Sequence, residues 1–230
     1  MFKQLLPLFA VTLALLVISC ASSKVILNKD YQFTSYDNPT LVVVLQREPS
    51  VNYSGNVEPE FGPGDPNTLI RAFFKKQLAE DISSQTGIRN VVFEQCIPKG
   101  YFNRHEVKPG DFSSEVEVLV DGGTFLCQNA NPGYVLVLSD IYIGTHLETN
   151  FSPGYMGANG MMMGGGSSAT KKLIYEARAY LYDNTAKQYI EYGKIKEAAS
   201  GFFPVITIGV WKSASSAFVR KLFEKTRLGG

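Results

Sequence analysis

The chain has 230 residues, of which 45% are hydrophobic, so it is long and apolar enough to bury one sizeable core. Its 22 Lys and Arg against 21 Asp and Glu leave almost no net charge, which gives no support to nucleic-acid binding. With two His, three Cys and no CxxC or HxxxH spacing, the usual zinc-site patterns are excluded, and we expect neither a metal nor a cofactor.

The amino-terminal segment has the order of a bacterial signal peptide. Lys3 is followed by an apolar stretch from Leu5 to Ile18, and the small residue Ser19 stands directly before Cys20. The stretch is shorter than the roughly 20 residues that a membrane-spanning helix needs, and no later segment of the sequence is long and apolar enough. We expect residues 1–19 to be removed on export.

Val17-Ile18-Ser19-Cys20 resembles the lipobox of bacterial lipoproteins. The resemblance implies that Cys20 receives diacylglycerol and a further acyl chain such as palmitate, each buried CH₂ holding the protein on the membrane by about 0.8 kcal/mol. Ala21, in place of the Asp that retains such proteins at the inner membrane, implies the periplasmic face of the outer membrane. The family usually has Leu and then Ala or Ser where Val17 and Ile18 stand, so a secretory signal with a coincidental cysteine is the alternative.

The chain after the cleavage point divides into an acidic and a basic half. Residues 20–150 carry 10 basic and 16 acidic side chains, a net −6, whereas residues 151–230 carry 11 and 5, a net +6. We expect the halves to pack together and neutralise each other. The alternative is an exposed basic surface that faces acidic envelope polymers.

Once Cys20 is acylated, Cys96 and Cys127 remain as an even pair in an oxidising compartment. A disulfide between them is plausible chemistry there and would close a loop of about 30 residues, stabilising the fold by roughly 3 kcal/mol. Two buried free thiols are the alternative.

The first predicted elements are a strand, a helix and a second strand. After a tether at residues 20–38, the apolar run Leu41–Leu45 predicts a buried strand. Residues 47–66 are rich in Pro, Gly and Asn and predict a long surface loop that ends in the helix cap Asp65-Pro66. The apolar residues of the helix recur at spacings of three and four and are Leu69, Ile70, Phe73, Phe74, Leu78 and Ile82.

Gly87 ends this helix, and Asn90–Phe93 predicts the second strand, parallel to the first through a right-handed crossover. Residues 115–120 alternate charged and apolar side chains like a strand, although Ser114 with Glu117 is equally typical of a capping box that opens a short helix. Residues 133–145 predict a long strand in which Asp140 marks a bulge or bend.

The last elements are a hairpin and a helix. Residues 174–182 and 188–196 flank a turn-rich connector and predict an antiparallel hairpin. The apolar stripe of the carboxy-terminal helix consists of Ala214, Ala217, Phe218, Leu222 and Phe223. The sum is an α+β fold, a mixed sheet of about five strands with two helices packed on it in the order β-α-β-β-β-β-α, in a single domain over residues 39–230.

The opening elements, from the strand at Leu41–Leu45 to that at Asn90–Phe93, resemble those of a group of envelope lipoproteins. The group includes the curli-secretion lipoproteins, the outer-membrane activators of peptidoglycan synthases and the amino-terminal domain of the Tol-system propeller protein. Residues 133–137 and 181–187 are similar to a later strand and hairpin of these proteins, with Asn131-Pro132 in place of Ala-Asp.

In the hairpin, Asp183-Asn184-Thr185-Ala186-Lys187 has Ala186 where the group has Gly, so the resemblance lies in the order of elements across residues 41–226. It implies a non-enzymatic periplasmic adaptor that docks on a larger envelope machine and sometimes forms a homo-oligomer.

Residues 151–170 place four methionines among six glycines. Such a segment cannot form a core of its own and predicts a loop between two strands. The methionines Met156, Met161, Met162 and Met163 could instead bind Cu(I), since thioethers suit that ion, or form an adaptable contact surface for a partner.

Residues 201–211 form the most apolar stretch after the signal peptide. Such a run usually belongs to the core. The alternative is a surface patch of Phe202, Phe203 and Trp211 that meets a partner or the bilayer interface.

The sequence offers no catalytic residues, since it contains no GxSxG or HExxH and neither histidine lies in a recognisable motif. The favoured function is therefore a membrane-anchored, non-enzymatic adaptor or assembly factor that binds another envelope protein. The alternatives are an envelope glycan-binding or hydrolytic lipoprotein and a curli-type secretion component, which needs two long amphipathic hairpins where the sequence has one candidate.

Overall fold

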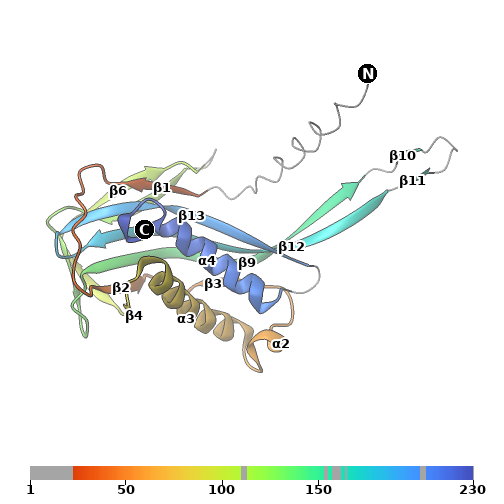
Figure 1. Cartoon of the computed structure of the whole chain (residues 1–230), viewed down its shortest axis with the longest axis horizontal. Helices are drawn as coiled ribbons and strands as arrows, with labels where there is room; N and C mark the ends of the chain where they lie inside the picture. Colours follow the sequence, from red (N-terminus) through yellow and green to blue (C-terminus); the bar gives the residue numbers. More distant parts are fainter. Residues whose placement is uncertain are drawn as a thin grey trace, which may run out of the picture.

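The computed structural model describes residues 23–109, 113–152, 155–156, 162–163, 165–202 and 206–229. It has an α+β fold built on a mixed seven-stranded sheet with strand order β1-β13-β12-β9-β2-β4, in which β3 pairs with β9 (Figure 1). These strands are β1 (Lys24–Leu27), β2 (Thr40–Leu45), β3 (Ser50–Asn52), β4 (Asn90–Phe93), β9 (Tyr134–Ser152), β12 (Gly166–Asp183) and β13 (Gln188–Phe202). The predicted α+β class is confirmed, whereas the predicted numbers of about five strands and two helices were too low.

The parallel part of the sheet follows the predicted strand, helix, strand order. β2 is an apolar run whose residues 41–45 are all buried, and it pairs in parallel with both β4 and β9. Between β2 and β4 lies helix α3 (Pro66–Thr86), whose N-cap Asp65 accepts a hydrogen bond of 2.8 Å from the backbone N–H of Thr68. Gly87 ends the helix with φ of 72°, a conformation that suits glycine.

The segment between β2 and α3 differs from the predicted loop. It contains the short strand β3, which pairs in parallel with β9, and the one-turn helix α2 (Glu58–Phe61). Both are too short to leave a periodic signal in the sequence, and both are stabilised by packing on the neighbouring sheet and helix.

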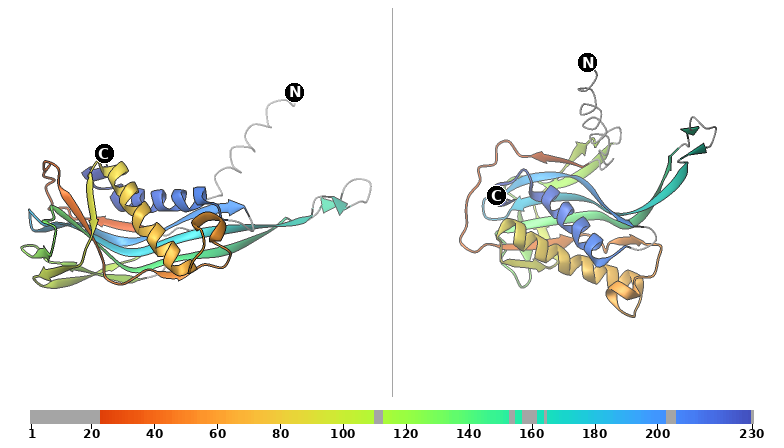
Figure 2. Two further views of the ribbon diagram at one scale, coloured as in Figure 1. Left: turned by 90° about the horizontal axis from the view of Figure 1, so that it is seen from below. Right: turned by 45° about the vertical axis from the view of Figure 1, so that its right-hand side comes forward.

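The antiparallel part of the sheet is built on the predicted hairpin of β12 and β13, and β9 pairs with the other edge of β12. β9 and β12 are longer than predicted, since Phe151–Ser152 and Gly166–Thr170 belong to strands rather than to the expected loop. The two strands run past the ends of α3 and α4 as an arm (Figure 2). Beyond them, Tyr155–Met156 (β10) pairs with Met162–Met163 (β11).

The expected tether also differs in its described part. Lys24–Leu27 forms β1 and pairs with β13 at the edge of the sheet. Farther along, the hydroxyls of Tyr31 and Tyr36 donate hydrogen bonds of 2.7 and 3.0 Å to the buried carboxylate of Asp183, the last residue of β12. Lys24–Leu27 therefore belongs to the sheet and not to a tether.

The bulge predicted at Asp140 is confirmed. Asp140 has φ of 48°, and the register of β9 against β12 shifts between Glu176 and Arg178. The extra residue in β9 shifts by one position which side chains point to each face of the sheet. Ile141 and Ile143 therefore join the same core as Leu138 instead of lying on the opposite face.

Helices α3 and α4 (Ile208–Phe223) cover one face of the sheet, as predicted for the carboxy-terminal helix, and a 3-10 turn (Arg227–Gly229) follows α4 (Figures 1 and 2). Trp211 of α4 is fully buried and packs against the rings of Tyr53 and Phe61, with centroid distances of 5.3 and 5.2 Å. Between the helices, the hydroxyl of Ser215 donates a 2.6 Å hydrogen bond to Asp81.

Two antiparallel ribbons pack against the other face of the sheet. One is β6 (Phe102–Val107) with β7 (Ser114–Leu119), so the strand and not the short helix is the outcome for this segment. The other is β5 (Cys96–Lys99) with β8 (Thr124–Cys127). A second core forms beneath them from Val42, Val44, Val107, Val116, Val118, Leu119, Phe125, Val135, Val137, Tyr180 and Tyr182. The sheet is thus buried on both faces at this end.

Candidate functional site

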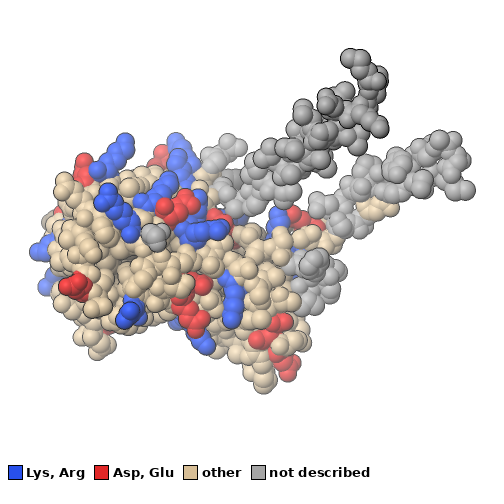
Figure 3. Space-filling model, in the orientation of Figure 1, with Lys and Arg blue, Asp and Glu red and all other residues tan. Residues whose placement is uncertain are grey.

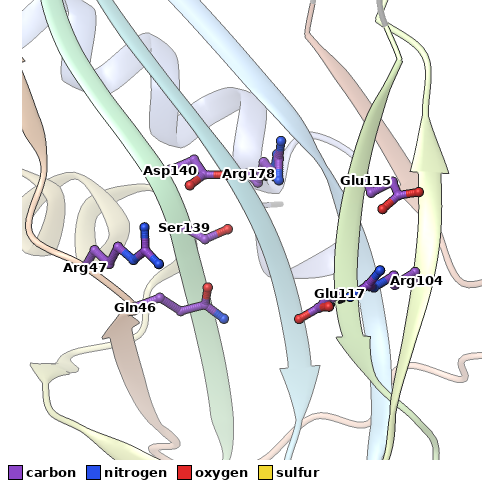
Figure 4. A pocket seen from close by; sticks show the side chains of 8 residues that line it. All are labelled: Gln46, Arg47, Arg104, Glu115, Glu117, Ser139, Asp140 and Arg178. Carbon is purple, nitrogen blue, oxygen red and sulfur yellow. Dashed lines mark hydrogen bonds and ion pairs between the residues drawn. The ribbon is translucent and has the colours of Figure 1, made fainter.

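A charged groove of about 330 Å³ lies where the β6–β7 ribbon meets the open part of the sheet (Figure 4). Its residues come from the end of β2, from β9, from β12 and from the ribbon. They are Gln46, Arg47, Arg104, Glu115, Glu117, Ser139, Asp140 and Arg178. Three arginines and three carboxylates line the groove, so its two signs of charge balance.

The bulge in β9 positions one side of the groove. Ser139 and Asp140 lie at the irregularity, and Arg178 pairs in register with Ser139 on the neighbouring strand. The guanidinium of Arg178 and the carboxylate of Asp140 form an ion pair of 3.0 Å. Both side chains remain partly exposed, so a ligand can reach the pair, and its contribution to stability is small.

The ribbon supplies the other side of the groove. Arg104 and Glu117 are register partners on β6 and β7, and Arg104 Nε donates a hydrogen bond of 2.9 Å to Glu117. Within the described part of the chain, neither Arg47 nor Glu115 forms an ion pair. The charges of Arg47 and Glu115 are therefore available to a ligand in the groove.

A groove of this composition suits a polar protein surface that carries both signs of charge, because complementary charges set the orientation and the specificity of docking. It is poorly suited to a purely anionic polymer, since two of its three arginines, Arg104 and Arg178, are paired with carboxylates. Among the described residues, no hydrogen bond joins the hydroxyl of Ser139 to any of the carboxylates that line the groove.

Two ion pairs at this face join the acidic and the basic half of the chain. Arg178 of the basic half pairs with Asp140 of the acidic half, and Lys172 pairs with Glu148 at 2.7 Å. Within the basic half, Lys194 pairs with Glu176 at 2.6 Å.

The structure places only some of the side chains that the sequence singled out. Cys96 and Cys127 are joined by a disulfide between β5 and β8, with Cα atoms 4.2 Å apart. Trp211, considered as a surface contact, is a core residue instead, because the apolar face of α4 buries it against the sheet.

For the other residues that were predicted to contact a partner, the structure does not describe side-chain positions. Cys20, Met161 and Phe203 lie outside the described residues. For Met156, Met162 and Met163 the structure describes the backbone pairing of β10 with β11, and for Phe202 the backbone pairing with Thr170 at the end of β13. These contacts therefore stay predictions.

Sequence reasoning missed the groove, because its residues lie as far apart as Gln46 and Arg178 and only the strand register joins them. One signal was available. Asp140 interrupts an otherwise apolar strand, and a charged residue at a bulge often marks a place where side chains are redirected towards a ligand.

Two features are absent from the residues that the structure describes. No helix among them combines the length and apolarity that crossing a bilayer requires. In the same residues, no group of three or more His, Cys, Asp and Glu side chains is arranged to hold a metal ion.

No family model matches the sequence, and neither does any curated protein. Similar solved structures include the PelC dodecamer from Paraburkholderia phytofirmans, 10% identical, with a TM-score of 0.34 over 86% of this chain and 97% of that chain. Another is a neuraminyllactose-binding hemagglutinin homologue from Helicobacter pylori, 11% identical, with a TM-score of 0.35 over 87% of this chain and 89% of that chain. Similarity this low supports no conclusion about function, and the resemblance to the curli-secretion group stays a prediction.

Proposed function

We propose that this chain is a lipid-anchored, non-enzymatic adaptor of the bacterial cell envelope, held at the outer membrane through Cys20, which docks another envelope protein in the charged groove. The anchor is supported by the lipobox-like sequence before Cys20. The docking role is supported by the balanced charges of the groove and by the free Arg47 and Glu115 at its sides.

The position of β1 carries the proposal. Ser23 is already fixed to the sheet, because its hydroxyl donates a hydrogen bond of 2.8 Å to the carbonyl of Lys196. Three residue steps separate it from Cys20, and they span at most about 11 Å. An acylated Cys20 would therefore hold the folded domain directly at the lipid surface.

The groove lies close to this attachment point. Lys24 pairs in register with Lys194 of β13, which in turn pairs with Arg178 of β12. Two strand spacings amount to about 10 Å, so the groove and the start of β1 share one region of the sheet. A protein bound in the groove would be kept near the membrane.

Mass spectrometry of the protein from its bacterial host tests the anchor. We expect the chain to begin at Cys20 and to carry the mass of a diacylglyceryl group, because the thiol is the acceptor. Cys20→Ser should lose this mass, whereas Ser19→Ala, which keeps a small residue before the cysteine, should retain it. An intact leader peptide or an unmodified Cys20 thiol would refute the anchor.

Site-specific photo-crosslinking tests the docking role. A photoreactive residue in place of Arg47 should capture one defined envelope protein in living cells, whereas the same residue in place of Arg220, on the exposed side of α4, should not. Adding Arg178→Glu should lower the yield about tenfold, because it places a second negative charge beside Asp140. Equal capture from both positions, or no effect of Arg178→Glu in a folded variant, would contradict docking in the groove.

A further inference from the structure

Two adjoining hollows lie at the other side of the domain, between the segment after β1 and the carboxy-terminal end of the chain. The first, of about 380 Å³, is lined by Tyr31, Phe33, Lys225 and Arg227 among others. The second, of about 330 Å³, is lined by Phe33, Arg227 and Arg89 among others. Because Phe33 and Arg227 line both hollows, the two adjoin, and they are treated together as one depression.

The depression is cationic, unlike the charged groove. Lys225, Arg227 and Arg89 line it and are exposed, and no residue that lines either hollow is an Asp or a Glu. Within the described part of the chain, neither Arg89 nor Arg227 forms an ion pair, and the ammonium of Lys225 donates a 2.7 Å hydrogen bond to the carbonyl of Val25. Its positive charge is thus not cancelled by a neighbouring lining carboxylate.

Of the carboxylates outside the lining, Asp30 and Asp37 are exposed and adjoin lining residues along the chain, but among the described residues neither forms an ion pair with a lining cation; Asp183 is buried and engaged. Asp183 is fully buried and accepts hydrogen bonds from four groups, the hydroxyls of Tyr31 and Tyr36 and the backbone N–H groups of Thr185 and Ala186. These bonds compensate its charge inside the protein.

Near the carboxy-terminal end of the chain, the carboxylate of Glu224 forms an ion pair of 2.7 Å with Lys221. Glu191 is 4% exposed, and burial raises the pKa of its carboxyl to about 8, so it is mostly neutral at pH 7. Neither group therefore cancels the positive charge of Arg227 in solution.

Aromatic side chains give the depression an apolar wall. Tyr31, Phe33 and Tyr36 are all half-buried, and the rings of Tyr36 and Tyr134 lie 5.6 Å apart. The two hydroxyl bonds to Asp183 hold this segment in place, so the wall is formed in advance of any ligand.

We propose that this depression binds an organic anion, a carboxylate or phosphate group attached to a ring or apolar body. Arg227 and Lys225 bind the anionic group, and the body lies against Phe33. Guanidinium groups bind carboxylate and phosphate through two parallel hydrogen bonds, and aromatic walls supply the apolar contact. The site is independent of the anchor and of the charged groove.

Calorimetric titration of the purified full chain, in a neutral maltoside detergent, tests the site with phenyl phosphate as the probe. We expect phenyl phosphate to bind at least about tenfold more tightly than inorganic phosphate, which lacks the ring, or phenyl glucoside, which lacks the charge. Arg227→Gln should weaken the binding of phenyl phosphate about tenfold, and Arg220→Gln, an exposed arginine outside both hollows, should leave it unchanged.

Thermal unfolding of each variant, carried out in parallel, identifies any loss of fold, and Lys225→Gln provides a second lining variant should Arg227→Gln fail to fold. The proposal is overturned by equal affinity for phenyl phosphate and inorganic phosphate. It is equally overturned when the Arg220 variant weakens binding as much as a folded lining variant does, or when phenyl phosphate does not bind.

Discussion

The carboxyl group of Glu191 is buried in the folded protein. It lies on β13 with 4% of its surface exposed, and its Oε2 has no hydrogen-bond partner within the described structure. Burial raises the pKa of Glu191 to about 8; the neighbouring Lys225 opposes this and Glu224 adds to it. The folded protein therefore keeps a proton that the unfolded chain releases near pH 4.5.

This difference predicts a pH-dependent stability. Because the pKa of Glu191 is higher in the folded than in the unfolded protein, the contribution of this group to stability is fully present below about pH 4.5. This contribution is lost as the pH rises through about 8. Between these values the free energy of unfolding should fall by up to about 1.4 kcal/mol for each pH unit. Glu191→Gln should flatten this part of the profile, since the amide does not ionise.

Urea unfolding between pH 5 and pH 9 provides the measurement. Glu224→Gln is the matched control, because it removes an exposed carboxyl and leaves Glu191 in place; it should lower the pKa of Glu191 and shift the profile, but keep its steepness. A Glu191→Gln profile as steep as that of the unchanged protein would show that Glu191 does not titrate in this range.

The sequence predicts the strands and helices that are marked by their own residues and need no distant partner. The apolar run at Leu41–Leu45, the cap at Asp65 and the glycine at position 87 each mark a strand or a helix end, and the structure confirms them. The bulge at Asp140 belongs here too, since a charged residue inside an apolar strand is visible without a partner.

The elements that the sequence missed are those that depend on distant partners. β1 has four residues and becomes a strand by pairing with β13, so Lys24 lies opposite Lys194. β3 has three residues and pairs with β9 in the same way. The charged groove could not be predicted for the same reason, because its side chains meet through strand register rather than through spacing along the chain.

The disulfide between Cys96 and Cys127 acts on an element that could not persist alone. β5 and β8 have four residues each, and their register partners Ile97 and Leu126 are 68% and 46% exposed, so Phe125 is the one large apolar side chain that the described ribbon buries. Closing a loop across 31 residues restricts the unfolded chain and stabilises the fold by about 3 kcal/mol. The covalent bond thus replaces packing that the ribbon lacks.

Considered as a whole, the molecule divides its sheet between two cores. Alternate residues of β2 contribute to each, with Leu41 and Val43 under the helices and Val42 and Val44 under the ribbons. On the face that carries α3 and α4, positive and negative side chains are interspersed (Figure 3). Recognition is therefore expected at local features, the charged groove and the cationic depression, rather than through one overall field.

The short distance between Cys20 and the start of β1 predicts where the whole domain lies when it is anchored. A fluorophore attached at Lys24 should be strongly quenched by a quencher carried on lipid headgroups, because the three residue steps before Ser23 span at most about 11 Å. Inserting ten Gly and Ser residues between Ser22 and Ser23 adds a flexible reach of roughly 18 Å and should reduce the quenching. Vesicle-reconstituted protein provides the measurement, with labelled Cys20→Ser as the unanchored control. Equal quenching with and without the insertion would mean that the domain rests on the membrane through its own surface and not through the shortness of its connection to the lipid.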